Sequence, residues 1–122
     1  MKTILLLACL FATLLPAGEA EDFDAGMKAA EAAFQDGRYK DAVDAYQKAE
    51  GLSQGFGLSD PRHVRALARL ADAQSLKGDY ALAEGNAKKA LDMAAKGGAE
   101  EGAALNALGD ATYGLEHAVE AE

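Results

Sequence analysis

The most constraining feature of the chain is a short motif that occurs twice, 41 residues apart. The segments at 37–42 (GRYKDA) and 78–83 (GDYALA) share a glycine, a tyrosine two residues later and an alanine three residues after that. A further alanine follows seven residues after each copy, at Ala49 and Ala90. Self-similarity at a fixed spacing is typical of stacked supersecondary units, each burying its apolar face against its neighbour. We therefore expect a repeat architecture.

The N-terminal residues have the layout of a secretory signal peptide. Lys2 precedes an uncharged apolar run over 4–15, and small residues lead to a cleavage point after Ala20. The run is shorter than the roughly 20 residues that span a bilayer. Cys9 lies in a stretch that resembles a lipoprotein cleavage box, but the apolar run continues past it, so we interpret Cys9 as part of the leader. We expect signal peptide 1–20, a domain over 21–122, and a secreted or periplasmic protein.

The remaining chain favours helices over strands. Alanine is abundant, Pro61 is the only proline after residue 16, and no alternating run of β-branched residues occurs. Phe23, Met27, Ala30 and Phe34 recur at three- and four-residue steps, the spacing of one helix face. We expect an all-α fold with five helices: over about 22–35, from about 39 through Ala49 to an end that the sequence leaves open, and over 61–77, 79–96 and 100–120.

Several residue types mark helix ends. Ser59 or Asp60 can accept hydrogen bonds from the free N–H groups of a helix that begins at Pro61. Glycines at 37, 78 and 97 can adopt the left-handed conformation that ends a helix. Because these connections are short, consecutive helices should be antiparallel neighbours. The glycine-rich segment 51–58 should fray or form a linker, with Leu52 and Phe56 tucked beneath it.

At these positions the chain resembles the tetratricopeptide repeat family, in which each repeat is a helix-turn-helix of 34 residues. Gly37 with Tyr39, and Gly78 with Tyr80, match the glycine and aromatic residue of the family's inter-helix turn. The family's small packing residues match Ala30, Ala42 and Ala49 in the first copy and Ala71, Ala83 and Ala90 in the second. The resemblance implies a short right-handed solenoid of antiparallel helix pairs that binds a protein or peptide along its concave face.

The chain departs from the family pattern in two respects. Leu108-Gly109 match the leucine-glycine pair of a third copy, but Glu116 stands where its turn glycine is expected, so this copy is truncated to one helix. The 41-residue spacing also exceeds the period, and the excess falls in 51–60, as in longer-linker members that resemble kinesin light chains. We expect repeat one over about 22–57, repeat two over about 60–96 and a capping helix over about 100–120. The alternative to a repeat protein is a generic alanine-rich helical bundle.

One stripe of the third helix is rich in arginine. Arg62, Arg65 and Arg69 lie at three- and four-residue steps and share a face, in a chain of net charge −8. Arginine makes bidentate bonds to carboxylates. By resemblance, Arg65 and Arg69 match sites where some family members clamp a partner's C-terminal carboxylate, although the other clamp positions hold Met27 and Glu31. The candidate peptide-binding residues are Arg62, Arg65, Arg69, Asp72, Met27, Glu31 and Asn106.

Two other interpretations stay open. The arginine stripe is also typical of a solvated face with internal ion pairs, such as Arg69 with Asp72. An exposed apolar stripe could instead drive self-association, which would make the chain a homodimeric structural helical bundle. The mass of the protein in solution distinguishes self-association from peptide binding, because a tight dimer would bury the peptide-binding groove.

The composition and motifs argue against several other functions. An acidic chain lacks the basic footprint that nucleic acids and anionic membranes require. His63 and His117 fall in different helices without a close-spaced ligand pair, so we expect surface histidines and no metal site. No serine–histidine or cysteine–histidine arrangement is supported by its sequence context. We therefore expect a scaffold that is not an enzyme and needs no cofactor.

Overall fold

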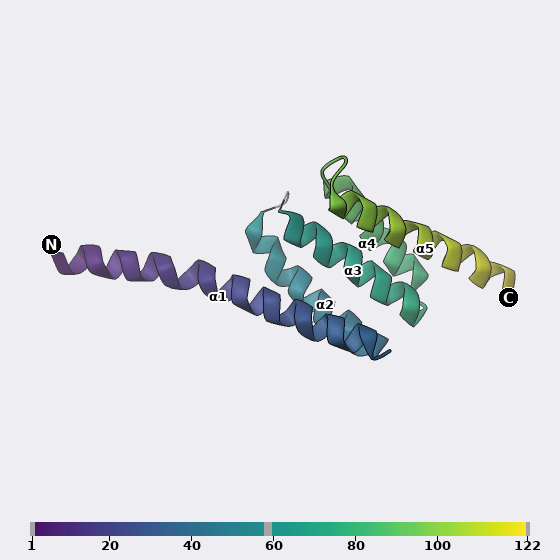
Figure 1. Cartoon of the computed structure of the whole chain (residues 1–122), viewed down its shortest axis with the longest axis horizontal. Coiled ribbons are helices and arrows are strands. Elements are labelled where there is room, and N and C mark those ends of the chain that lie inside the picture. The colour runs from purple at the N-terminus through teal and green to yellow at the C-terminus, as the bar shows by residue number, and fades with distance from the viewer. Residues whose placement is uncertain (1, 58–59, 122) are drawn as a thin grey trace.

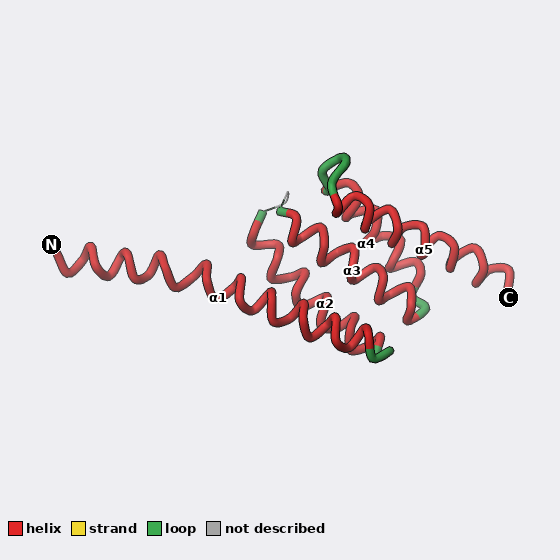
Figure 2. The backbone as a smooth tube through the Cα atoms, viewed as in Figure 1, coloured by secondary structure: helices red, strands yellow, loops and turns green. Residues whose placement is uncertain are grey.

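The computed structural model describes residues 2–57 and 60–121, and within them the chain forms helices and no strand. The elements are α1 (Lys2–Gln35), α2 (Tyr39–Ser53), a 3-10 turn η1 (Gln54–Phe56), α3 (Pro61–Lys77), α4 (Tyr80–Met93) and α5 (Ala99–Ala121). Figure 2 shows these helices joined by short loops. The prediction of an all-α fold with five α-helices is confirmed.

The helices stack as a short solenoid in two layers. Each helix packs against the next along the chain, and α3 also packs against α5. In Figure 1 the first helices of the pairs, α1, α3 and α5, lie in front, and α2 and α4 lie behind them. This arrangement leaves the faces of α1, α3 and α5 to form one side of the molecule.

The two copies of the motif form the same turn. Gly37 and Gly78 both have a positive φ, of 78° and 99°. In each turn the glycine N–H donates to the carbonyl three residues earlier, at 3.1 Å. The next N–H, of Arg38 or Asp79, donates to the carbonyl five residues earlier, at 2.9 and 2.8 Å. Glycine is favoured at both positions because a Cβ disfavours this backbone conformation.

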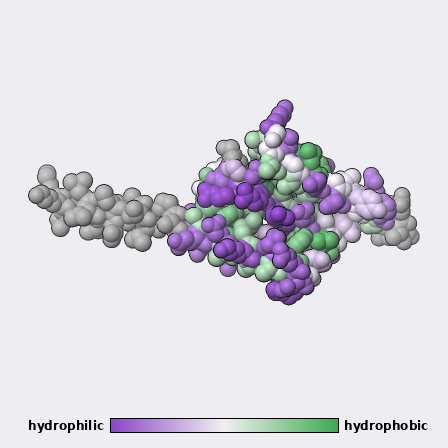
Figure 3. Space-filling model, viewed as in Figure 1, coloured by the Kyte–Doolittle hydropathy of each residue, from purple (hydrophilic) through white to green (hydrophobic). Residues whose placement is uncertain are grey.

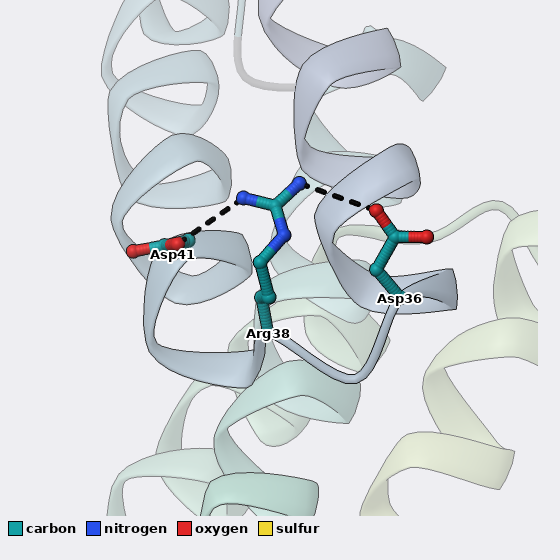
Figure 4. Close-up of polar contacts among 3 residues, drawn as sticks. All are labelled: Asp36, Arg38 and Asp41. Carbon is teal, nitrogen blue, oxygen red and sulfur yellow. Dashed lines mark hydrogen bonds and ion pairs between the residues drawn. The ribbon is translucent and has the colours of Figure 1, made fainter.

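The residue after the first turn glycine adds an exposed ion-pair network. The Arg38 guanidinium lies between two carboxylates, 3.4 Å from Asp36 and 3.2 Å from Asp41 (Figure 4). All three side chains are more than half exposed. Pairs in such positions contribute at most about 1 kcal/mol to stability. The conserved geometry of the turn therefore depends on its backbone bonds rather than on this network.

Small side chains bring the helices close together. The alanines matched to the family's packing positions are all fully buried: Ala30, Ala42, Ala49, Ala71, Ala83 and Ala90. The largest fully buried side chains are Tyr46 and Leu67, each 1 % exposed. Tyr46 packs with residues of α1, α2 and α3, and Leu67 with residues of α3, α4 and α5. The core thus consists of a few large side chains set among alanines.

Two helix ends differ from the sequence expectation. The helix expected from about residue 22 begins at Lys2, so α1 runs without a break through the predicted leader, and the acidic residues of 21–24 lie in its interior. Its N-terminal half extends past the other helices in Figure 1. The helix expected to reach residue 96 ends at Met93, because Ala94 is extended. Met93 and Ala94 pack against the core cluster around Leu67.

The segment expected to be a linker is ordered by contacts up to Gly57. α2 passes Gly51 and ends at Ser53, and η1 follows. As expected, Leu52 and Phe56 tuck in, here against a cluster that includes Phe23. The rings of Phe23 and Phe56 meet edge to face, with centroids 5.4 Å apart. Beyond the segment, the Asp60 carboxylate caps α3 by accepting from the Arg62 N–H at 2.9 Å; Ser59, the other expected cap, lies outside the described residues.

Within the part of the chain that the structure describes, no helix is both long and apolar enough for a bilayer crossing.

Candidate peptide-binding groove

A groove of about 730 Å³ opens on the side formed by the first helices. It lies between the C-terminal ends of α1 and α3 and the C-terminal half of α5, with the start of α4 at its edge. Its lining residues are Phe34, Asp72, Ser75, Leu76, Tyr80, Asn106, Asp110, Tyr113, Gly114, His117 and Ala118. In Figure 3, hydrophobic surface lies over the C-terminal end of α3 and over the first turns of α5, between hydrophilic areas.

The groove combines exposed apolar side chains with packed aromatic rings. Leu76 is 53 % exposed and Tyr113 is 63 % exposed, so both leave much apolar surface in water. The Tyr113 ring stacks on His117, with ring centroids 3.8 Å apart. The Tyr80 ring lies against Gly114, where a Cβ would overlap it. Exposed apolar surface rimmed by polar groups is characteristic of interaction sites.

The three predicted arginines lie outside this lining, and each already has a carboxylate partner. Arg62 pairs with its own helix cap, Asp60, at 2.8 Å, and its guanidinium lies 3.8 Å from the Phe56 ring centroid. Its hydrogen bonds hold the pKa of Asp60 at about 2. Arg65 pairs with Glu100 at 3.2 Å, and Arg69 approaches Asp72 at 4.0 Å. The arginine stripe of α3 is therefore a face on which each arginine pairs with a carboxylate of the same chain.

The other predicted residues divide between the core and the groove. Met27 is half-buried and packs against two core clusters. Glu31 accepts a hydrogen bond from the Tyr46 hydroxyl at 2.8 Å, and burial, with this bond, raises the pKa of Tyr46. Asp72 and Asn106 line the groove. Of the predicted set, only these two lie in the cavity.

Comparison with known families identifies the repeat. The tetratricopeptide repeat model matches residues 25–96, which include both copies of the turn motif. The chain belongs to the tetratricopeptide repeat family. Tetratricopeptide repeats generally mediate protein–protein contacts and are typically scaffolds rather than enzymes. Searches of the curated proteins and of the solved structures gave no match.

Asp72 is the carboxylate in the groove of this tetratricopeptide domain whose pKa is clearly raised. Its side chain is 25 % exposed. Burial, with the nearby carboxylates of Asp110 and Glu31 and against the attraction of Arg69, raises the pKa of Asp72 to about 6. The Asp72 carboxylate thus places a negative charge in the groove, and Arg69, at 4.0 Å, neutralises it only in part.

We predict that Asp72→Asn stabilises the protein at pH 7 and not at pH 4. A carboxyl whose folded-state pKa lies above its unfolded value of about 3.8 favours the fold at low pH and loses that contribution as pH rises through about 6. Removing the charge should therefore raise the free energy of unfolding at pH 7 by about 1–3 kcal/mol, with the gain vanishing near pH 4. Urea denaturation at both pH values measures this difference.

The matched control is Asp44→Asn, which removes one carboxylate at an exposed position of α2. It should change the free energy of unfolding by no more than about 0.5 kcal/mol. A gain from Asp72→Asn that is the same at pH 4 and pH 7 would contradict a raised pKa at Asp72.

Sequence reasoning missed most of the groove, although the signal was present. Leu76 continues the arginine stripe of α3 beyond Asp72 at the next helical step, and Asp110, Tyr113 and His117 continue from Asn106 along α5 at steps of three and four. Extending both stripes toward the C-terminal ends of the helices would have found these residues. The predicted residues extend along α3 toward the arginines, whereas the cavity lies at the other end of the same stripe.

The expectation of a surface histidine is wrong for His63. Its side chain is buried, and Nε2 lies 3.0 Å from an oxygen of Glu50. Burial alone would raise the pKa of Glu50, but hydrogen bonds from Gln54 and His63 outweigh it and lower that pKa. His117 is exposed, as expected. Among the residues whose side chains the structure describes, 18–57 and 60–118, no cluster of three acidic, histidine or cysteine side chains could hold a metal ion.

Proposed function

We propose that this tetratricopeptide protein is an exported scaffold that holds an extended peptide segment of a partner protein in the groove between α1, α3 and α5. The observation that carries the proposal is the pair of exposed apolar side chains, Leu76 and Tyr113, at a cavity on the face of the first helices. A cavity of about 730 Å³ falls in the range of about 300–1,000 Å³ typical of ligand sites. Family membership supports a protein partner.

Export rests on the layout of the first residues: a basic start, an apolar run and small residues before Ala20. The mature protein would then begin at Glu21 and lie in the periplasm or outside the cell. N-terminal sequencing of the protein from an extracytoplasmic fraction tests this, and a chain that still begins at Met1 would count against export.

A carboxylate clamp at Arg65 and Arg69 receives less support from the geometry. A ligand carboxylate would have to replace Glu100 at Arg65 and compete with Asp72 at Arg69. Each exchange returns one carboxylate of this chain to water or leaves it unpaired. The apolar groove beyond Asp72 is therefore the better-supported contact surface.

Self-association is the second candidate function. Leu82 on α4 is 60 % exposed, and with Leu115 it lines a smaller cleft at the end of the solenoid. A second copy of the chain could cover this apolar surface. Analytical ultracentrifugation at micromolar concentration distinguishes the functions: a stable dimer that Leu82→Ala dissociates would favour self-association.

Peptide selection tests the proposed groove directly. Heptapeptides selected from a random display library on the protein should bind in the groove, and Leu76→Ala should weaken the selected peptides by about tenfold or more, as expected for a buried contact at the centre of an interface. Leu105→Ala is the matched control, because Leu105 is 50 % exposed on α5 but outside the lining. Equal affinity for both variants would contradict the groove.

A further inference from the structure

The charged side chains of the groove are mainly acidic. Asp72 lines it from α3 and Asp110 from α5, and among the lining residues there is no lysine or arginine. Arg69 approaches Asp72 at only 4.0 Å. Within the described residues, Asp110 has no ion-pair partner. The groove therefore presents more negative charge than its neighbours balance.

A buried hydroxyl in the groove wall also lacks a partner. Ser75 is 9 % exposed, and its Oγ is buried without any hydrogen bond. The same residue lines the groove. Buried polar atoms in folded proteins are nearly always paired, and an unpaired one costs about 1–3 kcal/mol. Ser75 thus offers unused hydrogen-bonding capacity at the wall, independently of the two carboxylates.

The remaining lining suits an aliphatic chain that ends in a cation. Phe34, Tyr80 and Tyr113 contribute aromatic rings, and Leu76 contributes an aliphatic side chain. Lysine and arginine carry an apolar stem and a charged head, which prefer different surroundings. Aromatic faces attract such cations, and carboxylates form charge-assisted hydrogen bonds with them.

We propose that the groove holds a lysine or arginine side chain of the bound peptide, with its cation between Asp72 and Asp110 and its stem against Leu76 and Tyr113. Ser75, whose hydroxyl is buried and unpaired, lies in the wall of the same groove. This assignment rests on the proposed function and adds the charge of the ligand to it. The arginine stripe predicted a ligand with a negative charge, but those arginines are already paired, and the groove instead favours a ligand with a positive charge.

The test uses the heptapeptides selected on the full-length protein. Their sequences should be enriched in lysine or arginine at one position. Replacing that residue by norleucine should weaken binding about tenfold, and Asp110→Asn should do the same. Isothermal titration calorimetry of synthetic peptides measures both effects.

Because the whole chain is acidic, a control for general attraction is needed. Asp44→Asn removes the same charge from an exposed site on α2 that lies outside the groove, and it should change affinity less than twofold. Equal losses from Asp110→Asn and Asp44→Asn would overturn the assignment, since they would mean attraction to net charge alone.

The outcomes separate this inference from the function on which it rests. Acidic or neutral peptides that Leu76→Ala weakens would overturn the basic ligand and leave the peptide-binding groove standing. Peptides that tolerate Leu76→Ala would overturn both. Basic peptides that are sensitive to Leu76→Ala and Asp110→Asn, and not to Asp44→Asn, would support both.

Discussion

Leu67→Ala should lower the free energy of unfolding by about 2–5 kcal/mol, the range for fully buried leucines. Leu67 is 1 % exposed and packs with Val64, Ala68, Ala90 and Ala104 from three helices. Most of these neighbours are alanines, whose side chains cannot bend into the space that the leucine leaves, and only Leu91 and Met93 at the edge of the cluster can move toward it. Part of the cavity should therefore persist and add its cost to the lost burial. Thermal unfolding followed by circular dichroism should show a Tm lower by at least about 10 °C.

Leu105→Ala is the control for this substitution. Leu105 is 50 % exposed on α5, so the same truncation there should change the free energy of unfolding by about 0.5 kcal/mol or less. If both variants melted at the same temperature, the cluster that joins α3, α4 and α5 would not be the core of the second repeat.

The features that the sequence predicted correctly are set by local chemistry. The two turns follow from glycines whose positive φ needs no long-range contact, and the cap of α3 follows from Asp60 beside Pro61. The buried alanines were identified because the family's helices can approach closely only at small residues. The glycines and the capping residue lie within a few residues of the helix ends that they specify.

The features that the sequence missed depend on contacts between helices. His63 is buried because Glu50 of α2 lies opposite it, 13 residues earlier in the chain. α4 ends at Met93, after which the backbone of Ala94 is extended while Met93 and Ala94 both pack against the cluster around Leu67. The groove forms where the ends of α1 and α3 meet the C-terminal half of α5, so no single helix contains it. Periodicity showed which residues share a stripe but not which end of the stripe faces a cavity.

The same contacts give the groove a defined floor. Tyr80, the aromatic residue of the second turn motif, reaches from the start of α4 to Gly114 of α5. Gly114 is buried, and its neighbour Tyr113 projects into water at the groove. A residue that the family pattern assigns to the inter-helix turn therefore also shapes the candidate binding surface.

Gly114→Ala should destabilise the protein by about 1–3 kcal/mol, even though alanine is the better helix former. A Cβ at this position would overlap the Tyr80 ring, so the ring must rotate or α4 and α5 must separate. If the ring moves, the groove that Tyr80 and Gly114 line together changes shape. We therefore expect a lower Tm and, in the same variant, weaker binding of the selected peptides.

Gly109→Ala provides the comparison within the same helix. Nothing lies within 4 Å of a Cβ built at Gly109, so this substitution should stabilise α5 by up to about 1 kcal/mol through helix propensity alone. The two alanine variants should then differ in free energy of unfolding by about 2–4 kcal/mol, with opposite signs relative to the parent protein. Because both gain the same helix propensity, the difference isolates the contact between Tyr80 and Gly114. Equal stabilisation of both variants would mean that the ring does not pack against α5 in solution.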